Sequence, residues 1–305
     1  MTLNSINEQV LGQIRIGPAG WSYADWAGIV YPAPRGRAFD PVAYLADFFD
    51  TIEINTSFYR PIRRKLAEQW IERIARNPDF VFTAKLWELF THIGEVTPEN
   101  ERLVREGFFP LFQAGKLGAV LLQFPFSFHR TRETDARLEQ LLDRFGDYPL
   151  VVEVRHASWN SEDFFSMLRA RGVGFCNIDQ PVIGQSIKPT ERSTSSVSYV
   201  RLHGRRYDTW FSDDPTLPSA ERYNYLYSPE ELREWARRIR HIASNSKSTF
   251  AITNNHFEGK GPVNALELIH LLTGRRTHVP EPLRRHYPRL GSIAADPSHE
   301  PILFT

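Results

Sequence analysis

The chain has little of what marks disulfide-rich, membrane-spanning or strongly charged proteins. Its single cysteine, Cys176, excludes an internal disulfide framework and is typical of a reducing compartment. No stretch approaches the run of about 18 apolar residues that a membrane span needs, and residues 1–7 lack the basic and apolar regions of a signal peptide. The formal net charge is +1, so a site for an anion must be local. The sequence predicts a soluble, cytoplasmic protein that does not bind membranes.

Motifs of several well-known enzyme classes are also missing. The turn after the first apolar run, Gly17-Pro-Ala-Gly-Trp21, is no G-x-G-x-x-G, and Pro18 lacks a backbone N–H that a dinucleotide site needs. There is no G-x-S-x-G nucleophile elbow and no H-x-x-H or H-E-x-x-H spacing. Cys176 lies within an apolar run and is predicted to be a buried small side chain, not a reactive thiol.

Short apolar runs alternate with helical patterns along the chain. Three helices are predicted to start at a capping residue followed by proline, at Asp40, Thr97 and Ser228, and one is predicted to end at Gly274. This alternation, at a length near the roughly 250 residues of a (β/α)8 barrel, favours one closed TIM-type barrel over an open doubly wound sheet. The strand candidates are Ile14–Gly17, Thr51–Asn55, Phe80–Leu86, Ala119–Phe124, Leu150–Arg155, Val173–Ile178, Ser198–Leu202 and Thr249–Thr253.

The alternating pattern predicts a single α/β domain over residues 1–305. The barrel is expected over about residues 13–274, and the Pro- and Arg-rich residues 275–305 are expected to form an extended tail lying on it. Residues 204–227 form a long polar and aromatic loop after the seventh strand, long enough to be a functional lid.

Polar side chains interrupt the apolar runs near the ends of the strands. Glu153 and Arg155 share one parity in the fifth strand, and Arg201 and His203 share one in the seventh. Because side chains alternate across a strand, each pair points the same way, toward the end where such barrels keep their chemistry. Other strands contribute Glu53, Asn55, Lys85 and Gln123, with Asn177 or Asp179 from the sixth and one of Asn254, Asn255 and His256 from the eighth.

The charges of this set favour an anionic ligand. Lys85, Arg155 and Arg201 outnumber the carboxylates Glu53 and Glu153, so one cation stays available after two ion pairs form. A layer of mutually paired charges with only a structural role is the alternative, but barrel layers are usually apolar.

Aromatic residues are frequent in the loops after the strands, where they could stack on a base or a sugar. We therefore expect a small anionic partner such as a nucleotide or sugar phosphate. The aromatic residues are Trp21, Tyr23, Trp26, Phe58, Tyr59, Trp87, Trp159, Tyr207, Trp210 and Phe211, and we expect them to rim one mouth.

A metal site is the competing interpretation of the same strand ends. The possible ligands are His156, His203, His256, Glu53, Glu153 and Asp179. Arginines at the same strand ends would repel a divalent cation. A divalent metal is therefore possible but disfavoured, no metal ligands are predicted, and the cofactor is left unknown.

Seven segments, taken in order, carry a family resemblance. They are Gly17–Trp26 (G-T-S-G-W-x-Y-x-x-W), Thr51–Tyr59 (V-E-I-N-x-x-F-Y), Phe82–Lys85 (F-x-x-K), Leu117–Pro125 (L-G-x-x-L-x-Q-x-P), Val152–Trp159 (V-E-x-R-H-x-S-W), Tyr199–Gly204 (Y-x-R-L-H-G) and Asn254–His256 (N-N-x). Over about residues 13–273 the chain resembles the domain of unknown function family 72, the YecE-like proteins. The resemblance implies a TIM-barrel fold and no established reaction. Pro18-Ala19 departs from the usual Thr-Ser pair.

The parity pattern and the resemblance select the same residues. The predicted catalytic residues are Glu53, Lys85, Glu153 and His203, and the predicted substrate-binding residues are Trp21, Asn55, Tyr59, Gln123, Arg155, His156, Arg201 and Asn255.

We expect an enzyme, a hydrolase or lyase, acting on a phosphorylated or otherwise anionic substrate. In this hypothesis Arg155 and Arg201 hold the anion, Glu153 or His203 moves a proton, and Lys85 stabilises developing negative charge together with Asn255. The alternatives are a nucleic-acid-binding protein or nuclease, less favoured because the net charge is near zero, and a non-catalytic sensor of a small metabolite. The sequence does not determine the oligomeric state.

Overall fold

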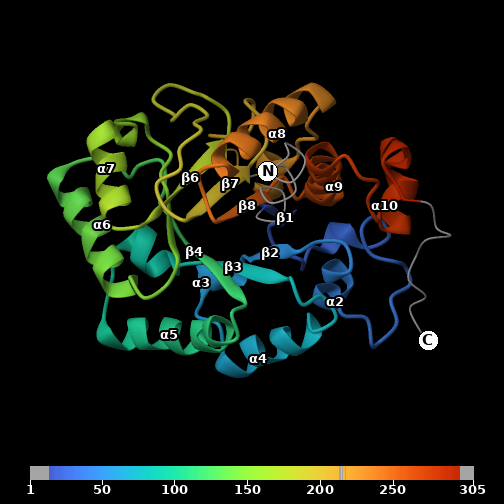
Figure 1. Cartoon of the computed structure of the whole chain (residues 1–305), viewed down its shortest axis with the longest axis horizontal. Helices are drawn as coiled ribbons and strands as arrows, with labels where there is room; N and C mark the ends of the chain where they lie inside the picture. The colour runs from blue at the N-terminus through green and yellow to red at the C-terminus, as the bar shows by residue number, and fades with distance from the viewer. Residues whose placement is uncertain (1–13, 213, 215, 217, 296–305) are drawn as a thin grey trace, which may run out of the picture.

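Eight parallel strands form the centre of the molecule. The computed structural model describes residues 14–212, 214, 216 and 218–295, so the N-terminal segment assessed as a signal peptide and residues 296–305 of the tail lie outside the described residues. The strands neighbour one another in the order β1-β8-β7-β6-β5-β4-β3-β2, which confirms the predicted TIM-type barrel (Figure 1). They are β1 (Ile14–Pro18), β2 (Thr51–Ile54), β3 (Val81–Lys85), β4 (Leu117–Gln123), β5 (Leu150–Glu153), β6 (Gly174–Asp179), β7 (Val197–Leu202) and β8 (Ser248–Thr253).

The first and second strands nearly close the barrel. They meet through a parallel bridge between Ala19 and Glu53, where the Gly20 N–H donates to the Glu53 carbonyl at 2.9 Å. Nearer the start of the strands, Gly17 lies so close to Thr51 that a Cβ atom built on Gly17 would be 1.8 Å from the Thr51 carbonyl oxygen. Glycine is therefore required at position 17 because the two backbones approach each other there.

We expect Gly17→Ala to destabilise the protein by about 3 kcal/mol or more, because the added methyl group must push β1 away from β2. Gly36→Ala is the matched control: no atom lies within 4 Å of a Cβ built there, and its cost should stay within about 0.5 kcal/mol. Urea unfolding of both variants measures the difference, and equal midpoints would contradict this account of the barrel seam.

Helices surround the strands on the outside of the barrel (Figure 1). The three predicted capping residues are confirmed: Asp40 accepts from the Val42 and Ala43 N–H groups, Thr97 accepts from Asn100, and Ser228 forms a reciprocal capping box. The helices are α2 (Pro41–Ala46), α3 (Thr56–Tyr59), α4 (Arg64–Arg73), α5 (Pro98–Gln113), α6 (Arg132–Phe145), α7 (Glu162–Ala170), α8 (Pro229–Ala243), α9 (Lys260–Thr273) and α10 (Glu281–His286). Shorter helical turns are η1 (Ala24–Trp26), η2 (Leu89–Ile93), η3 (Ala157–Trp159), η4 (Ser219–Tyr223), η5 (Phe257–Gly259) and η6 (Pro288–Ser292).

The connection between β6 and β7 departs from the repeat. Residues 180–196, all of them described, contain no helix. The Asn177 side chain holds this segment: its Nδ2 donates to the Arg192 carbonyl at 2.8 Å, and its Oδ1 accepts from Thr190 Oγ1 and Arg192 N, both at 2.7 Å. Asn177 thus serves the connection outside the barrel.

The C-terminal segment is not an extended tail where it is described. Residues 281–292 form α10 and η6, and Leu283 and Leu290 are fully buried. Arg289 pairs with Glu267 of α9 at 2.6 Å. Apolar contacts and an ion pair therefore fold this segment onto the barrel.

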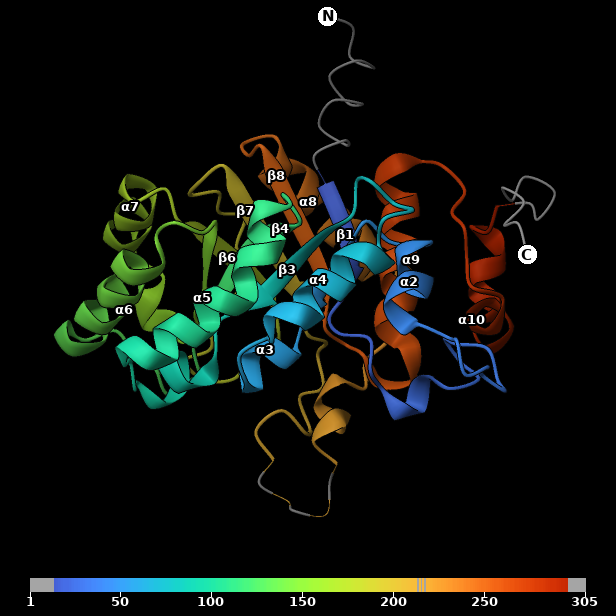
Figure 2. The same ribbon diagram turned by 90° about the horizontal axis from the view of Figure 1, so that it is seen from below.

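The polar loop after β7 reaches the end of the barrel where the strands finish. Figure 2 shows η4 of this loop at the same end as α3, which follows β2. No helix in the described part of the chain is both long and apolar enough to cross a membrane.

Candidate functional site

Three charged side chains, none with exposed surface, form an ion-pair network inside the barrel. Arg201 Nη2 lies 2.9 Å from Glu53 Oε1, and Arg201 Nη1 lies 2.6 Å from Glu153 Oε2. Arg201 Nη1 also donates to Gln123 Oε1 at 2.8 Å. The alternation of side chains brings these residues of β2, β4, β5 and β7 together, as the sequence predicts.

Further groups satisfy the two carboxylates. Arg155 Nη2 and Nε donate to Glu153 Oε1 at 2.9 and 3.1 Å, and the Arg155 guanidinium lies 5.7 Å from the centre of the Trp210 ring. On the other side, the Tyr199 hydroxyl donates to Glu53 Oε2 at 2.9 Å. Buried charges are tolerated when they are paired and hydrogen-bonded in this way.

The network keeps its members ionised. Burial alone would raise the pKa of Glu153, but Arg201 and Arg155 hold it well below its usual range. Burial alone would lower the pKa of Arg201, but Glu153 and Glu53 hold it well above its ordinary value. These groups are therefore fixed charges at neutral pH.

His203 is neutral beside this network. Burial, and then the charge of Arg201, lower the pKa of His203 to about 3. Its Nδ1 lies 3.0 Å from the Asn254 Nδ2, which can only donate, so the proton of the ring belongs on Nε2. That Nε2 lies 3.4 Å from Glu153 Oε1, longer than a normal hydrogen bond, and has no other described partner.

Of the three cations in this network, Lys85, Arg155 and Arg201, it is Lys85 that lines a cavity. Its Nζ lies 3.5 Å from Glu53 Oε1 and 5.4 Å from the centre of the Phe58 ring, and the residue is 8% exposed. Burial, and then the charge of Arg201, lower the pKa of Lys85 to about 8. Lys85, Arg155 and Arg201 outnumber Glu53 and Glu153, so the network carries an excess positive charge while Lys85 is protonated.

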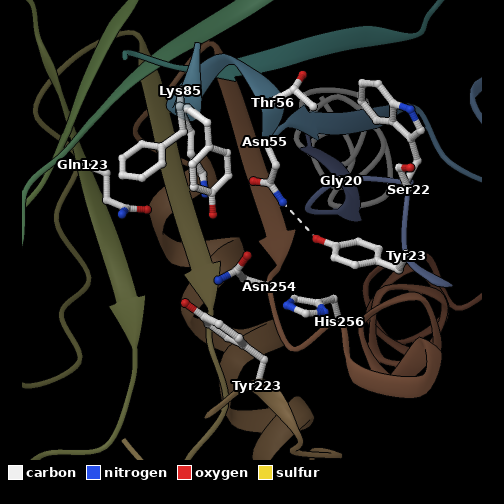
Figure 3. Close-up of a pocket in the computed structure, with 13 residues that line it drawn as sticks. Gly20, Ser22, Tyr23, Asn55, Thr56, Lys85, Gln123, Tyr223, Asn254 and His256 are labelled. Carbon is white, nitrogen blue, oxygen red and sulfur yellow. Dashed lines mark hydrogen bonds between the residues drawn. The ribbon is translucent and has the colours of Figure 1, made fainter. Parts of the chain in front are cut away.

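The cavity has a volume of about 310 Å³ and opens where the strands end (Figure 3). None of the described residues that line it is acidic. Its lining combines aromatic rings, amides, one imidazole and one ammonium group, from Gly20, Trp21, Ser22, Tyr23, Asn55, Thr56, Phe58, Tyr59, Lys85, Gln123, Tyr223, Asn254 and His256.

One wall of the cavity contains linked hydrogen bonds and a pair of stacked rings. Asn55 Nδ2 donates to the Tyr23 hydroxyl at 2.9 Å, and that hydroxyl donates to the Ala19 carbonyl at 2.7 Å (Figure 3). The Tyr23 ring stacks on His256 with 4.2 Å between centres, and burial lowers the pKa of His256 to about 4. Asn55 Oδ1 and His256 Nδ1 are buried and have no hydrogen-bond partner among the described residues.

The predicted site residues divide into three groups. The first group lines the cavity and consists of Trp21, Asn55, Tyr59, Lys85 and Gln123. The second group belongs to the charged network outside the cavity lining and consists of Glu53, Glu153, Arg155, Arg201 and His203. The third group lies elsewhere and consists of His156 and Asn255. His156 instead contacts Ser158 Oγ at 2.8 Å and caps η3. Asn255 donates to the Tyr225 carbonyl and to Asn264 Oδ1, both at 2.8 Å. The expectation that these two residues join the others is therefore not met.

Several lining residues were missed or left ambiguous by the sequence argument. Immediately after β8, Asn254 and His256 line the cavity, whereas Asn255 bonds to Tyr225 and Asn264. In the sixth strand neither candidate points in, because Asp179 pairs with Arg205 at 2.9 Å. Tyr223 had no sequence signal, since it comes from the long loop. Two of the expected mouth aromatics, Trp26 and Trp159, are instead fully buried.

The competing metal interpretation finds no ligand cluster. Among residues 14–295, apart from 213, 215 and 217, no three or more His, Cys, Asp or Glu side chains are grouped so that they could hold a metal ion.

The chain is similar to a known family over most of its length. The family described as protein of unknown function DUF72 matches residues 15–288. This chain belongs to the DUF72 family. The UPF0759 protein YunF of Bacillus subtilis (strain 168) is 27% identical over an alignment of 270 residues that covers 85% of this chain and 94% of that protein.

Solved structures of DUF72 proteins share the fold. A DUF72 family protein from Thermotoga maritima MSB8 superimposes with a TM-score of 0.74 at 30% identity, covering 85% of this chain and 99% of that one. One from Enterococcus faecalis V583 gives a TM-score of 0.73 at 22% identity, covering 85% and 95%. The DUF72 resemblance predicted from the sequence motifs is thereby confirmed.

The segments that carry the DUF72 resemblance lie mainly at the carboxyl ends of the strands. Trp21 and Tyr23 come from the first segment, Asn55 from the second, and Lys85 and Gln123 from the next two. The segments on β5 and β7 supply Glu153, Arg155, Arg201 and His203 of the buried network, and the segment on β2 supplies Glu53. The motifs of the family therefore describe one cavity and the charges next to it.

Proposed function

We propose that this DUF72 protein is an enzyme, a hydrolase or lyase, that acts on a small phosphorylated or otherwise anionic substrate in the cavity beside Lys85. The observation that carries the proposal is the position of Lys85, a buried ammonium group facing a cavity that no described acidic side chain lines. Because the adjoining network already carries excess positive charge, an anion next to Lys85 would be stabilised.

The size and lining of the cavity favour a small molecule carrying a ring. A volume of about 310 Å³ is at the lower end of ligand pockets, which typically measure roughly 300–1,000 Å³. Tyr23, Tyr59 and Tyr223 offer ring faces and hydroxyl groups, as binding of a sugar or base requires. The unpartnered Asn55 Oδ1 would accept a hydrogen bond from a substrate hydroxyl or N–H group.

In this proposal Lys85 contacts the reacting group. A pKa of about 8 lets Lys85 stabilise negative charge when protonated and accept a proton when neutral, both near physiological pH. His256, with a pKa of about 4, is neutral at pH 7 and can contact the substrate as an uncharged imidazole.

The buried members of the network would act through Lys85. Glu53, Glu153, Arg201 and His203 have no exposed surface, so we assign them the task of placing Lys85 and setting its charge. The proton-transfer role predicted for Glu153 and His203 would require them to reach the substrate, which their burial does not favour.

A panel of phosphate esters, including sugar phosphates and nucleotides, tests the proposal. We expect wild-type protein to turn over at least one compound and Lys85→Met to reduce its kcat/KM by about 100-fold or more, the usual contribution of a group that moves protons or stabilises charge. Lys65→Met, which removes an exposed lysine of α4, is the control and should keep full activity.

Two other outcomes would overturn the proposal. Thermal stabilisation by a compound that is never turned over would make the protein a non-catalytic sensor. Turnover that survives Lys85→Met unchanged would place the chemistry elsewhere. Nucleic acid is less favoured as the partner, because tail arginines such as Arg284 and Arg289 are paired with Glu281 and Glu267.

A further inference from the structure

A second cavity adjoins the first one. Its volume is about 530 Å³, and Trp21, Ser22 and Thr56 line both cavities. In Figure 3, Ser22 and Thr56 lie on the side of the first cavity away from Gln123, and both also line the second cavity. The remaining lining comes from residues 60–63 and from α4, and it includes Arg60, Arg63 and Arg73. We call this second cavity the arginine groove.

The arginine groove carries positive charge that the described protein does not neutralise. Arg60 and Arg63 are exposed, and neither guanidinium has an ion pair or hydrogen bond with a described residue. Arg73, in contrast, pairs with Asp40 at 3.0 Å. No acidic side chain is among the described residues that line the groove. Two guanidinium groups are thus free to bind an anion.

The wall between the two cavities is aromatic. Trp21 is partly exposed and packs edge-on against Trp70, with 5.2 Å between ring centres and 85° between ring planes. Trp70 is only 3% exposed, so this contact anchors Trp21 to the buried core. A nucleoside bound between the cavities can therefore pack its base on Trp21 and place one anion in each cavity.

We propose that the arginine groove binds a second phosphate of the same substrate, through Arg60 and Arg63. The substrate is then a compound with two phosphates separated by a ring system, such as a small dinucleotide. The two positive charges favour an anionic group, and guanidinium groups bind phosphate oxygens through paired hydrogen bonds. This inference rests on the proposed function, because it assigns the first phosphate to Lys85.

The test compares two probes by isothermal titration calorimetry: thymidine 5′-monophosphate, and the thymidine dinucleotide with a 5′-phosphate. Wild-type protein should bind the dinucleotide about tenfold more tightly, the gain typical of added charge-assisted hydrogen bonds. The double variant Arg60→Ala/Arg63→Ala should bind the two probes equally, with mononucleotide affinity unchanged. Lys85→Met should weaken both.

The control variant is Arg64→Ala/Lys65→Ala. This variant also removes two positive charges, from residues of α4 that follow Arg63 in the sequence but do not line the groove. Arg64 is instead paired with Glu68 at 3.0 Å. The control variant should leave the dinucleotide affinity unchanged, which separates a specific contact from a general loss of positive charge.

Each remaining outcome decides one of the two proposals. No preference for the dinucleotide, or a preference that survives Arg60→Ala/Arg63→Ala, would overturn the arginine groove and leave the proposed function standing. A preference lost in that variant, together with unchanged affinity of Lys85→Met for both probes, would support the groove and contradict the role of Lys85. Absence of binding by either probe would overturn the groove proposal. The proposed function would then still be tested independently, by turnover of the phosphate esters.

Discussion

Replacing Arg201 by methionine should destabilise the protein by about 3–5 kcal/mol, the cost of removing one partner from a buried ion pair. Arg201 has no exposed surface and is the cation shared by Glu53 and Glu153. Without it, two buried carboxylates face each other across the barrel with less compensating charge. Urea unfolding at pH 7 measures the change in the free energy of unfolding.

Two further variants show whether the cost comes from the unpaired carboxylates. Arg102→Met removes an exposed arginine paired with Glu99 and Glu106, and should leave the free energy of unfolding nearly unchanged. Adding Glu53→Gln to Arg201→Met should recover part of the loss, because one buried charge is then removed as well. An Arg201→Met protein as stable as wild type would show that these ion pairs do not hold the barrel together.

Replacing Lys85 by methionine should have the opposite effect on stability. Its pKa is about 8 in the folded protein, against an ordinary value of 10.5. Below pH 8 the side chain is charged in both states and folding bears the full cost of burying that charge. Between pH 8 and 10.5 only the unfolded chain binds the proton, so the stability of the wild-type protein should rise with pH.

Lys85→Met removes that cost, and at pH 7 we expect a gain of about 1–3 kcal/mol, reduced from the full linkage value by the lost contact with Glu53. The gain should disappear as the pH approaches 10.5. Unfolding curves at pH 7 and pH 10 for both proteins measure it. A variant less stable than wild type at pH 7 would make Lys85 a structural residue and weaken the case for its function.

Taken together, these two predictions separate the charges that stabilise the barrel from the charge that costs it stability. A residue retained at a cost in stability is expected at a functional site, where activity and stability compete. Arg201 and Lys85 lie in one network, yet among the described residues Arg201 has two short ion pairs and Lys85 has one, at 3.5 Å. The functional assignment therefore rests on Lys85.

The sequence was most informative about the strands and least informative about the loops. The parity of Glu53, Glu153 and Arg201 was enough to predict that they meet, because a strand allows only two directions for a side chain. Asn255 was misplaced because one residue of uncertainty at the end of a strand reverses the direction of its side chain. Tyr223 was missed because its position depends on how a long loop folds back over the cavity.

The sequence by itself determined the barrel, the helix starts at Asp40, Thr97 and Ser228, and the family, because these depend on local patterns that neighbouring residues carry. Only the tertiary structure decided which polar residues face the cavity. Glu153 and Lys85 look alike in the sequence as charged strand-end residues, but Glu153 has no exposed surface and Lys85 lines the cavity. The accessibility of a side chain and the charges around it depend on contacts between residues far apart in the sequence. A local sequence pattern therefore cannot predict them.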